Sequence, residues 1–102
     1  MIGEKPRVYI MGPMSGLPDY NRDAFYDKAD ELRKAGCWPI HCADMPSGLS
    51  DDQYEKENNK RISTCRFYVL LDGWEKSEGV KRELDFAEKI GLMRIRLWRI
   101  EK

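Results

Sequence analysis

The stretch FYVLLDGWEKSEGVKRELDFAEKI, residues 67–90, predicts a strand, a loop and a helix in succession. Residues 67–71 form a continuous apolar run, whereas residues 72–77 are polar and contain a glycine, as is typical of the turn after a buried strand. Ser77 is a good N-cap for the helix that follows. The apolar residues that share one helix face are Val80, Leu84, Ala87 and Leu92. Glu83 lies on or beside this face, so its carboxylate either marks the boundary with water or points at a ligand.

Length and composition predict a single domain spanning residues 1–102. The 18 basic and 18 acidic residues cancel, so broad attraction to nucleic acid or to an anionic membrane is not indicated. No stretch approaches the roughly twenty consecutive apolar residues of a transmembrane helix, and no apolar signal segment follows the N-terminus. We therefore expect a cytoplasmic protein whose partner is neither a membrane nor a nucleic-acid polymer.

Three cysteines, Cys37, Cys42 and Cys65, are an odd number and argue against a disulfide framework. Cys37, His41 and Cys42 are close in sequence, which raises the question of a metal site. Their spacing matches none of the usual zinc patterns, and the chain has no second Cys/His pair. We expect small buried thiols on or beside a strand, and predict neither a metal ion nor a cofactor.

The whole chain alternates between strand and helix patterns. Strands are predicted at residues 7–11, 37–41, 67–71 and 93–98. Helices are predicted from an N-cap at Asn21 to about residue 35, from the Ser50 capping box onward, and over 77–90. The nearly continuous first run predicts a central strand, whereas Pro39 predicts an edge position for the second. This order indicates an α/β fold of right-handed βαβ units, with a parallel sheet covered by helices on both faces.

Ligands bind such sheets beyond the carboxyl ends of the strands, where the loops at residues 12–20 and 72–77 should meet. In the first loop Gly12 and Gly16 allow close approach of the backbone, and Ser15 offers a hydroxyl. In the second, Ser77 and Gly79 open a helix whose positive end attracts anions. The first loop has neither the P-loop signature nor the dinucleotide-binding signature. The two loops are therefore interpreted either as one phosphate or sugar site or as ordinary tight connections.

Glu83 would project beneath such an anion from about the second turn of the helix. Burial would raise its pKa, and a hydrogen bond from Tyr9, near the end of the first strand, would hold it as a carboxylate. A carboxylate held by a tyrosine beside a sugar is the arrangement of a covalent glycosyl-transfer nucleophile. The alternative is a boundary glutamate paired with Lys76 or Arg82, which spacing alone slightly favours.

Four motifs together resemble the nucleoside 2-deoxyribosyltransferase superfamily, in particular its short branch associated with phages and bacteria. They are VYIMGPMSG at residues 8–16, NRDAF at 21–25, GWEKS at 73–77 and S-x-G-x-x-x-E at 77–83. The resemblance spans nearly the whole chain. It implies a Rossmann-like three-layer sandwich with a four- to five-stranded parallel sheet. It also implies an N-glycosidase-type enzyme, a hydrolase or transferase of nucleotide metabolism, acting on 2′-deoxynucleosides or their 5′-monophosphates without a cofactor.

The resemblance also suggests roles for individual residues. Glu83 matches the nucleophile that attacks the anomeric carbon, and Tyr9 matches the tyrosine that orients it. The residues that match a 5′-phosphate cradle are Ser15, Gly16, Ser77 and Gly79, with Gly12 beside them. Arg22 is near this cradle in sequence and is a further candidate for phosphate contact. Relatives are dimers or larger, so a homo-oligomer is expected, in the host cytoplasm if the chain is phage-encoded.

One departure from the superfamily pattern concerns catalysis. Asn58 stands where relatives carry an aspartate that contacts the base or sugar and helps the base to leave; Arg66 likewise stands where many have aspartate. Asparagine cannot donate a proton as a general acid. Either another group such as Asp72 supplies the proton, or the substrate has a base that is a good leaving group. A non-catalytic nucleotide-binding or nucleotide-sequestering protein is therefore an alternative. A third is a scaffold with Trp74 and Trp98 on its contact surface.

Overall fold

The computed structural model describes residues 5–46 and 48–96, which form one alternating series of strands and helices. The strands are β1 (Arg7–Met11), β2 (Trp38–Ile40), β3 (Phe67–Leu70) and β4 (Met93–Arg94). The α-helices are α1 (Arg22–Lys34), α2 (Asp51–Ser63) and α3 (Glu78–Lys89). Short 3₁₀ helices, η1 (Pro18–Asn21) and η2 (Trp74–Lys76), precede α1 and α3. In the described part of the chain, every helix is too short or too polar to span a membrane.

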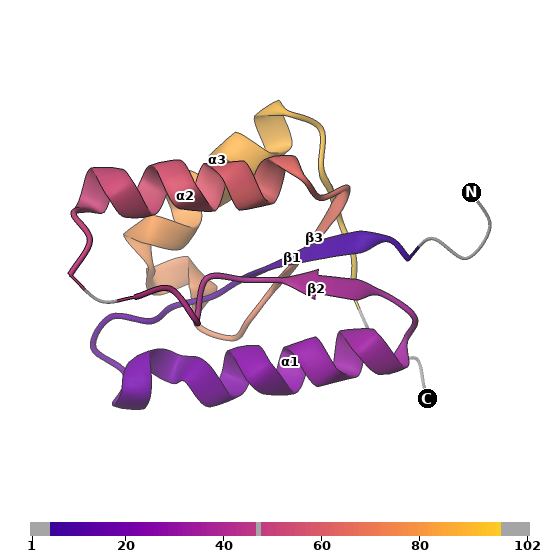
Figure 1. Cartoon of the computed structure of the whole chain (residues 1–102), viewed down its shortest axis with the longest axis horizontal. Helices are drawn as coiled ribbons and strands as arrows, with labels where there is room; N and C mark the ends of the chain where they lie inside the picture. The colour runs from indigo at the N-terminus through magenta and orange to yellow at the C-terminus, as the bar shows by residue number, and fades with distance from the viewer. Residues whose placement is uncertain (1–4, 47, 97–102) are drawn as a thin grey trace.

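The four strands form one parallel sheet in the order β2-β1-β3-β4 (Figure 1). The central position predicted for β1 and the edge position predicted for β2 are both confirmed. The last strand is shorter than predicted, since β4 has only two residues. Both are exposed, so the burial of side chains contributes little to a longer strand here. The N–H of Ile95 still donates to the carbonyl of Tyr68 at 2.9 Å, and the predicted end of the strand at Trp98 lies outside the described residues.

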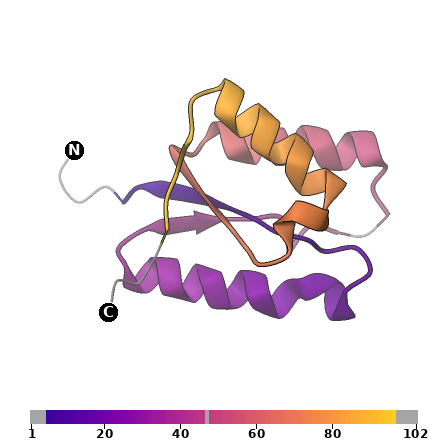
Figure 2. The ribbon, with the colours of Figure 1, turned by 180° about the vertical axis from the view of Figure 1, so that it is seen from behind.

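Helices cover both faces of the sheet, with α1 on one side and α2 and α3 on the other (Figures 1 and 2). The side chains of β1 alternate between the two layers of core. Val8 and Ile10 pack with the buried residues of α1, whereas Tyr9 and Met11 pack with those of α2 and α3. This alternation confirms the predicted α/β, Rossmann-like three-layer fold, and it directs Tyr9 toward the helix that carries Glu83.

Two of the three predicted helix caps are present. Ser77 Oγ accepts a hydrogen bond from the Val80 N–H at 3.2 Å at the start of α3. Ser50 and Gln53 form the reciprocal capping box of α2, with bonds of 3.1 and 2.8 Å. Both caps satisfy N–H groups that have no acceptor within the helix.

The third predicted cap, Asn21, is wrong in its role. Asn21 occupies the N-cap position of α1, but its side-chain amide donates to the carbonyl of Pro13 at 2.9 Å instead of capping the helix. The reason is a run of left-handed backbone, with φ of 48° at Asp19, 53° at Tyr20 and 62° at Asn21. Non-glycine residues seldom adopt this conformation, and the tie from Asn21 to the preceding loop supports it here.

Candidate active site

A pocket of about 440 Å³ opens beyond the carboxyl ends of the strands, within the size range of small-molecule sites. Its walls come from the loop after β1, the start of α1, the segment after β2, one face of α2 and the first turns of α3. Seven of the ten residues singled out from the sequence line it: Gly12, Ser15, Arg22, Asn58, Ser77, Gly79 and Glu83. The two loops predicted to meet therefore do so around one cavity.

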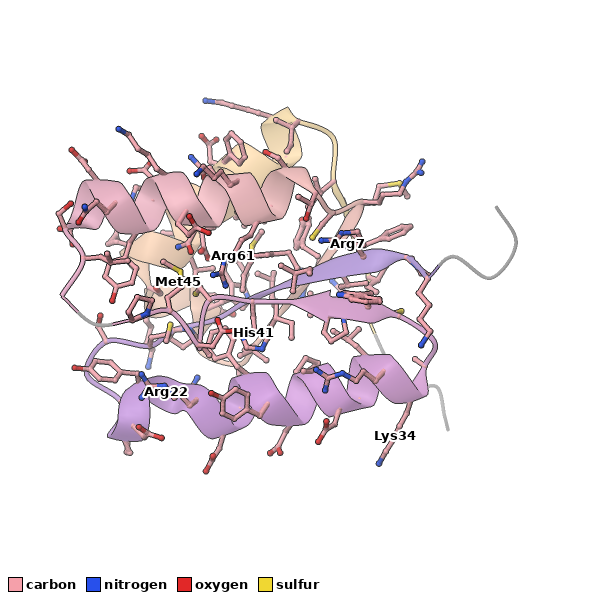
Figure 3. All side chains as sticks on the ribbon, viewed as in Figure 1. Arg7, Arg22, Lys34, His41, Met45 and Arg61 are labelled. Carbon is pink, nitrogen blue, oxygen red and sulfur yellow. The ribbon has the colours of Figure 1, made fainter. Side chains whose placement is uncertain are left out.

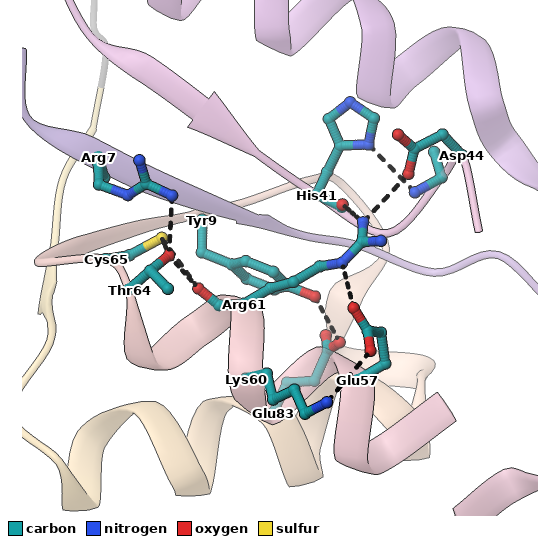
Figure 4. Close-up of polar contacts among 11 residues, drawn as sticks. Arg7, Tyr9, His41, Asp44, Glu57, Lys60, Arg61, Thr64, Cys65 and Glu83 are labelled. Atoms are coloured by element: carbon teal, nitrogen blue, oxygen red, sulfur yellow. Dashed lines mark hydrogen bonds and ion pairs between the residues drawn. The ribbon is translucent and has the colours of Figure 1, made fainter. Parts of the chain in front are cut away.

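Tyr9 and Glu83 form a hydrogen-bonded pair at the base of this pocket (Figure 4). The Tyr9 hydroxyl donates to Oε2 of Glu83 at 3.1 Å, so the middle of β1 is joined to the second turn of α3. Tyr9 is fully buried, whereas Glu83 keeps partial exposure through the pocket. Among residues 5–46 and 48–96, Glu83 forms no ion pair, so the alternative of a boundary glutamate paired with Lys76 or Arg82 is wrong.

The surroundings of the pair shift both of its pKa values. Burial raises the pKa of Glu83 from 4.5 to about 7, while the hydrogen bond from Tyr9 and the positive charge of Arg82 act in the opposite direction. Burial, and then the charge of Glu83, raise the pKa of Tyr9 well above 10.0. Tyr9 therefore stays protonated and remains a hydrogen-bond donor at any ordinary pH, and Glu83 titrates close to neutrality.

Two of the three glycines that line the pocket, Gly12 and Gly79, have different surroundings. A Cβ at Gly12 would lie 2.5 Å from Cδ1 of Leu71, so this glycine is required by the packing of the loop against the residue that follows β3. A Cβ at Gly79 would meet only Ser77 Oγ, at 3.8 Å, so the space beside the first turn of α3 is open. The N–H of Gly79 is one of those that have no acceptor within a helix. Of these two glycines, Gly79 is the one that leaves room for a ligand.

Three predicted residues do not line the pocket. Tyr9 lies behind the wall and acts on the cavity through Glu83. Gly16 is exposed at a turn with φ of 79°, and Asp72 is exposed between β3 and η2. Asp72 is therefore not placed to donate a proton to a group held in the pocket.

Arg22 lines the pocket, and two of its three guanidinium nitrogens already bind other residues. Its Nη1 forms an ion pair with Asp19 at 2.7 Å, its Nε donates to the carbonyl of Ala43 at 3.0 Å, and its guanidinium lies 5.4 Å from the centre of the Tyr20 ring. These contacts join the start of α1 to the segment after β2. Arg22 thus holds the wall together (Figure 3).

Sequence reasoning missed several residues of the pocket wall. The most notable is Cys42, whose thiol lies near both Tyr9 and Glu83 and contacts the sulfur of Met14 at 3.7 Å. Burial, and then the charge of Glu83, raise the pKa of this thiol to about 12. The position of Cys42 just after β2, at the carboxyl end of a strand, was the available signal.

The face of α2 that meets the pocket was also only partly predicted. Asp51, Tyr54, Glu55, Asn58 and Asn59 line the cavity at helical spacing. Asn58 belongs to this face, and its Oδ1 is buried without a hydrogen-bond partner in the described structure. Within the same ranges, no three His, Cys, Asp or Glu side chains are grouped so as to hold a metal ion.

The segment after β2 is held over the pocket by Arg61 of α2 (Figure 4). Its Nη1 donates to the carbonyl of His41 at 2.6 Å and pairs with Asp44 at 3.1 Å, while its Nε pairs with Glu57 at 3.4 Å. This segment also carries Met45, which is buried and reaches the pocket wall (Figure 3). The clamp therefore positions a wall that has no regular secondary structure of its own.

Comparison with known proteins agrees with this geometry at the level of the fold. A family described as a domain of unknown function, DUF4406, matches residues 6–95. The chain belongs to the DUF4406 family. No curated protein matches it. Among solved structures, this DUF4406 chain is similar to the CMP N-glycosidase BcmB of Clostridium botulinum, with a TM-score of 0.63 and 19% sequence identity, over 86% of this chain and 67% of that one. At this identity the likeness shows a shared fold.

Proposed function

We propose that the protein is an N-glycosidase-type enzyme of the nucleoside 2-deoxyribosyltransferase superfamily, which cleaves or transfers the N-glycosidic bond of (deoxy)nucleoside 5′-monophosphates. The observation that carries the proposal is the Tyr9–Glu83 pair at the base of the 440 Å³ pocket. The similarity to a CMP N-glycosidase of the same fold supports a nucleotide as ligand.

In the proposed reaction, the Glu83 carboxylate attacks the anomeric carbon of the sugar as the bond to the base breaks. A glycosyl ester on Glu83 forms, and water, or a second base in a transferase, then displaces the carboxylate from the sugar. The Tyr9 hydroxyl orients the carboxylate by its hydrogen bond. A pKa of about 7 leaves a substantial fraction of Glu83 ionised and nucleophilic at neutral pH.

The pocket also fits the two ends of a nucleotide. Ser15, Ser77 and Gly79 form a wall of hydroxyl and N–H donors suited to a phosphate. Tyr54 and Asn58, on α2, also line the pocket and are suited to a ring and its polar edge. The sugar would then bridge the two walls, above Glu83.

The test is to incubate the purified protein with a panel of nucleoside and deoxynucleoside 5′-monophosphates and to follow free base by chromatography. Base release by the wild type and its loss in Glu83→Gln are expected, with Glu88→Gln, on the exposed side of the same helix, as the control. If no substrate is cleaved, or if Glu83→Gln cleaves as fast as wild type, the enzymatic proposal fails.

A second candidate function is nucleotide binding without appreciable turnover. The observation that favours it is Asn58 in the pocket wall, because an amide cannot protonate a departing base and Asp72 lies outside the cavity. Calorimetry with nucleoside monophosphates distinguishes the two functions, since tight binding without base release supports this one. Absence of binding would remove both.

Homo-oligomerisation is proposed from the superfamily resemblance, as a dimer or larger. Two large apolar side chains are exposed at opposite edges of the sheet, Trp38 on β2 at 53% and Met93 on β4 at 64%. A contact through either edge would cover one of them. Sedimentation equilibrium of wild type, Trp38→Glu and Met93→Glu tests this, and a monomer at all concentrations would contradict it.

A further inference from the structure

The pocket wall contains two guanidinium groups with different surroundings. Arg22 is engaged by Asp19, by the carbonyl of Ala43 and by the Tyr20 ring. Arg82, on α3, has no hydrogen bond or ion pair with any residue of the described ranges. A guanidinium that lines a cavity and keeps all its donors free is available to a ligand.

The position of Arg82 places this free charge beside the open end of α3. It lies three residues after Gly79, and therefore on the same side of the helix, where the first turn presents unpaired N–H groups and Ser77 offers its hydroxyl. The α2 part of the pocket wall presents the carboxylates of Asp51 and Glu55. An anion in the pocket is thus repelled by the carboxylates of Asp51, Glu55 and ionised Glu83, and attracted to Arg82 and the first turn of α3.

We propose that Arg82 is a specificity-determining residue, which binds the phosphate of the substrate and makes the pocket select nucleoside 5′-monophosphates over nucleosides. This inference rests on the proposed function. A phosphate monoester carries close to two negative charges at neutral pH, and a guanidinium binds two of its oxygens at once. Arg22, the arginine that sequence position suggested for this role, already uses its Nε and Nη1 to bind Ala43 and Asp19.

A competing role for Arg82 is purely electrostatic. Its positive charge helps to keep Glu83 ionised, so its removal should slow the reaction of every substrate. That effect acts on the nucleophile and is the same whether or not the substrate carries a phosphate. The ratio of kcat/KM for a monophosphate to kcat/KM for its nucleoside cancels it and isolates contact with the phosphate.

The experiment measures this ratio with deoxycytidine 5′-monophosphate and deoxycytidine, and with the deoxyadenosine pair, in wild type, Arg82→Gln and Arg82→Lys. Arg82→Gln is expected to lower the ratio about 10- to 100-fold and Arg82→Lys less, because lysine keeps the charge without the bidentate geometry. Lys81→Gln is the matched control, since Lys81 pairs with Glu78 and does not line the pocket. An unchanged ratio in Arg82→Gln, with turnover intact, would overturn the inference and leave the proposed function standing.

Calorimetry gives a readout that does not depend on turnover. In a Glu83→Gln background, Arg82→Gln is expected to weaken binding of the monophosphate about 10- to 100-fold and to leave the weak binding of the nucleoside unchanged. If no variant or wild type shows turnover but this loss is seen, the inference stands and the enzymatic proposal fails. Equal binding of the monophosphate by both proteins would overturn the inference whatever the activity.

Discussion

The hydroxyl of Tyr9 donates a hydrogen bond to Oε2 of Glu83 at 3.1 Å, which joins the central strand of the sheet to the second turn of α3. A second pair of the same chemistry is present on α3, where the Tyr68 hydroxyl donates to Oε2 of Glu88 at 3.2 Å. Glu88 is exposed, whereas Glu83 lies at the base of the pocket. The second pair is therefore a control for the first.

Replacing Tyr9 by Phe should raise the pKa of Glu83 above about 7, because the hydroxyl hydrogen bond now favours the ionised carboxylate. The acid limb of the pH profile of kcat/KM should move to higher pH. In urea unfolding, the free energy of unfolding of Tyr9→Phe should be about 2 kcal/mol lower than that of wild type at pH 8. The difference should be smaller at pH 5, where Glu83 is protonated. Tyr68→Phe is the control, and a Tyr9→Phe effect that is equal at both pH values would contradict the prediction.

Replacing Glu83 by Gln should stabilise the protein at high pH while abolishing activity. The pKa of Glu83 is raised in the folded state, so the folded state binds the proton more tightly than the unfolded chain does. Wild-type stability should therefore fall as the pH rises from 4.5 to about 7. Glu83→Gln lacks this fall and should be more stable than wild type by about 1–3 kcal/mol at pH 8, and equal to it below pH 4.5. Unfolding curves across this range measure the difference; Glu88→Gln should show no such divergence.

Substitutions at Gly12 and Gly79, two glycines of the pocket wall, should separate stability from binding. Gly12→Ala should lower the free energy of unfolding by about 1–3 kcal/mol, because its methyl group would lie 2.5 Å from Cδ1 of Leu71. Gly79→Ala should leave stability unchanged or slightly higher, because its methyl group enters open space and alanine favours a helix. It should nevertheless weaken binding of nucleoside monophosphates by calorimetry, since that space is proposed for phosphate. Unaltered affinity in Gly79→Ala would argue against the phosphate position.

Cys42 should be a poor nucleophile despite its place in the pocket. With a pKa of about 12, its thiolate fraction at pH 8 is on the order of 10⁻⁴. Alkylation by iodoacetamide, followed by peptide mass spectrometry, should therefore be on the order of a thousandfold slower in the folded protein than in guanidinium chloride. Labelling at equal rates in both conditions would show that the thiol is far more acidic than its surroundings indicate.

Restoring a carboxylic acid at position 58 should accelerate base release if the enzyme lacks a proton donor there. Asn58→Asp is expected to raise kcat by up to about a hundredfold for bases that are poor leaving groups, because general acid catalysis then assists their departure. Asn59→Asp, on the same helix face, is the matched control. A rate that is unchanged in Asn58→Asp would show that another group of the pocket already supplies the proton.

Most of the fold could be predicted because local sequence carries its signals. The apolar run at residues 67–71, the capping box of Ser50 and the N-cap at Ser77 are read from neighbours along the chain. Asn21 was misjudged because its hydrogen bond to Pro13 depends on three consecutive left-handed residues, which no propensity indicates. The two-residue length of β4 likewise depends on how little the neighbouring layers cover it.

The candidate site divides in the same way. The sequence by itself determined the strand–loop–helix order, the meeting of two loops at the carboxyl ends of the strands, and Glu83 beside Tyr9 as the pair to examine. Only the tertiary structure decided that Arg22 binds Asp19 and Ala43 whereas Arg82 has no partner among the described residues. It also decided that Asp72 and Gly16 lie outside the cavity and that Cys42 lines it. The physical reason is that hydrogen-bond partners, burial and the side of a wall on which a charge lies are set by contacts between segments distant in the chain. Spacing along one element does not encode them.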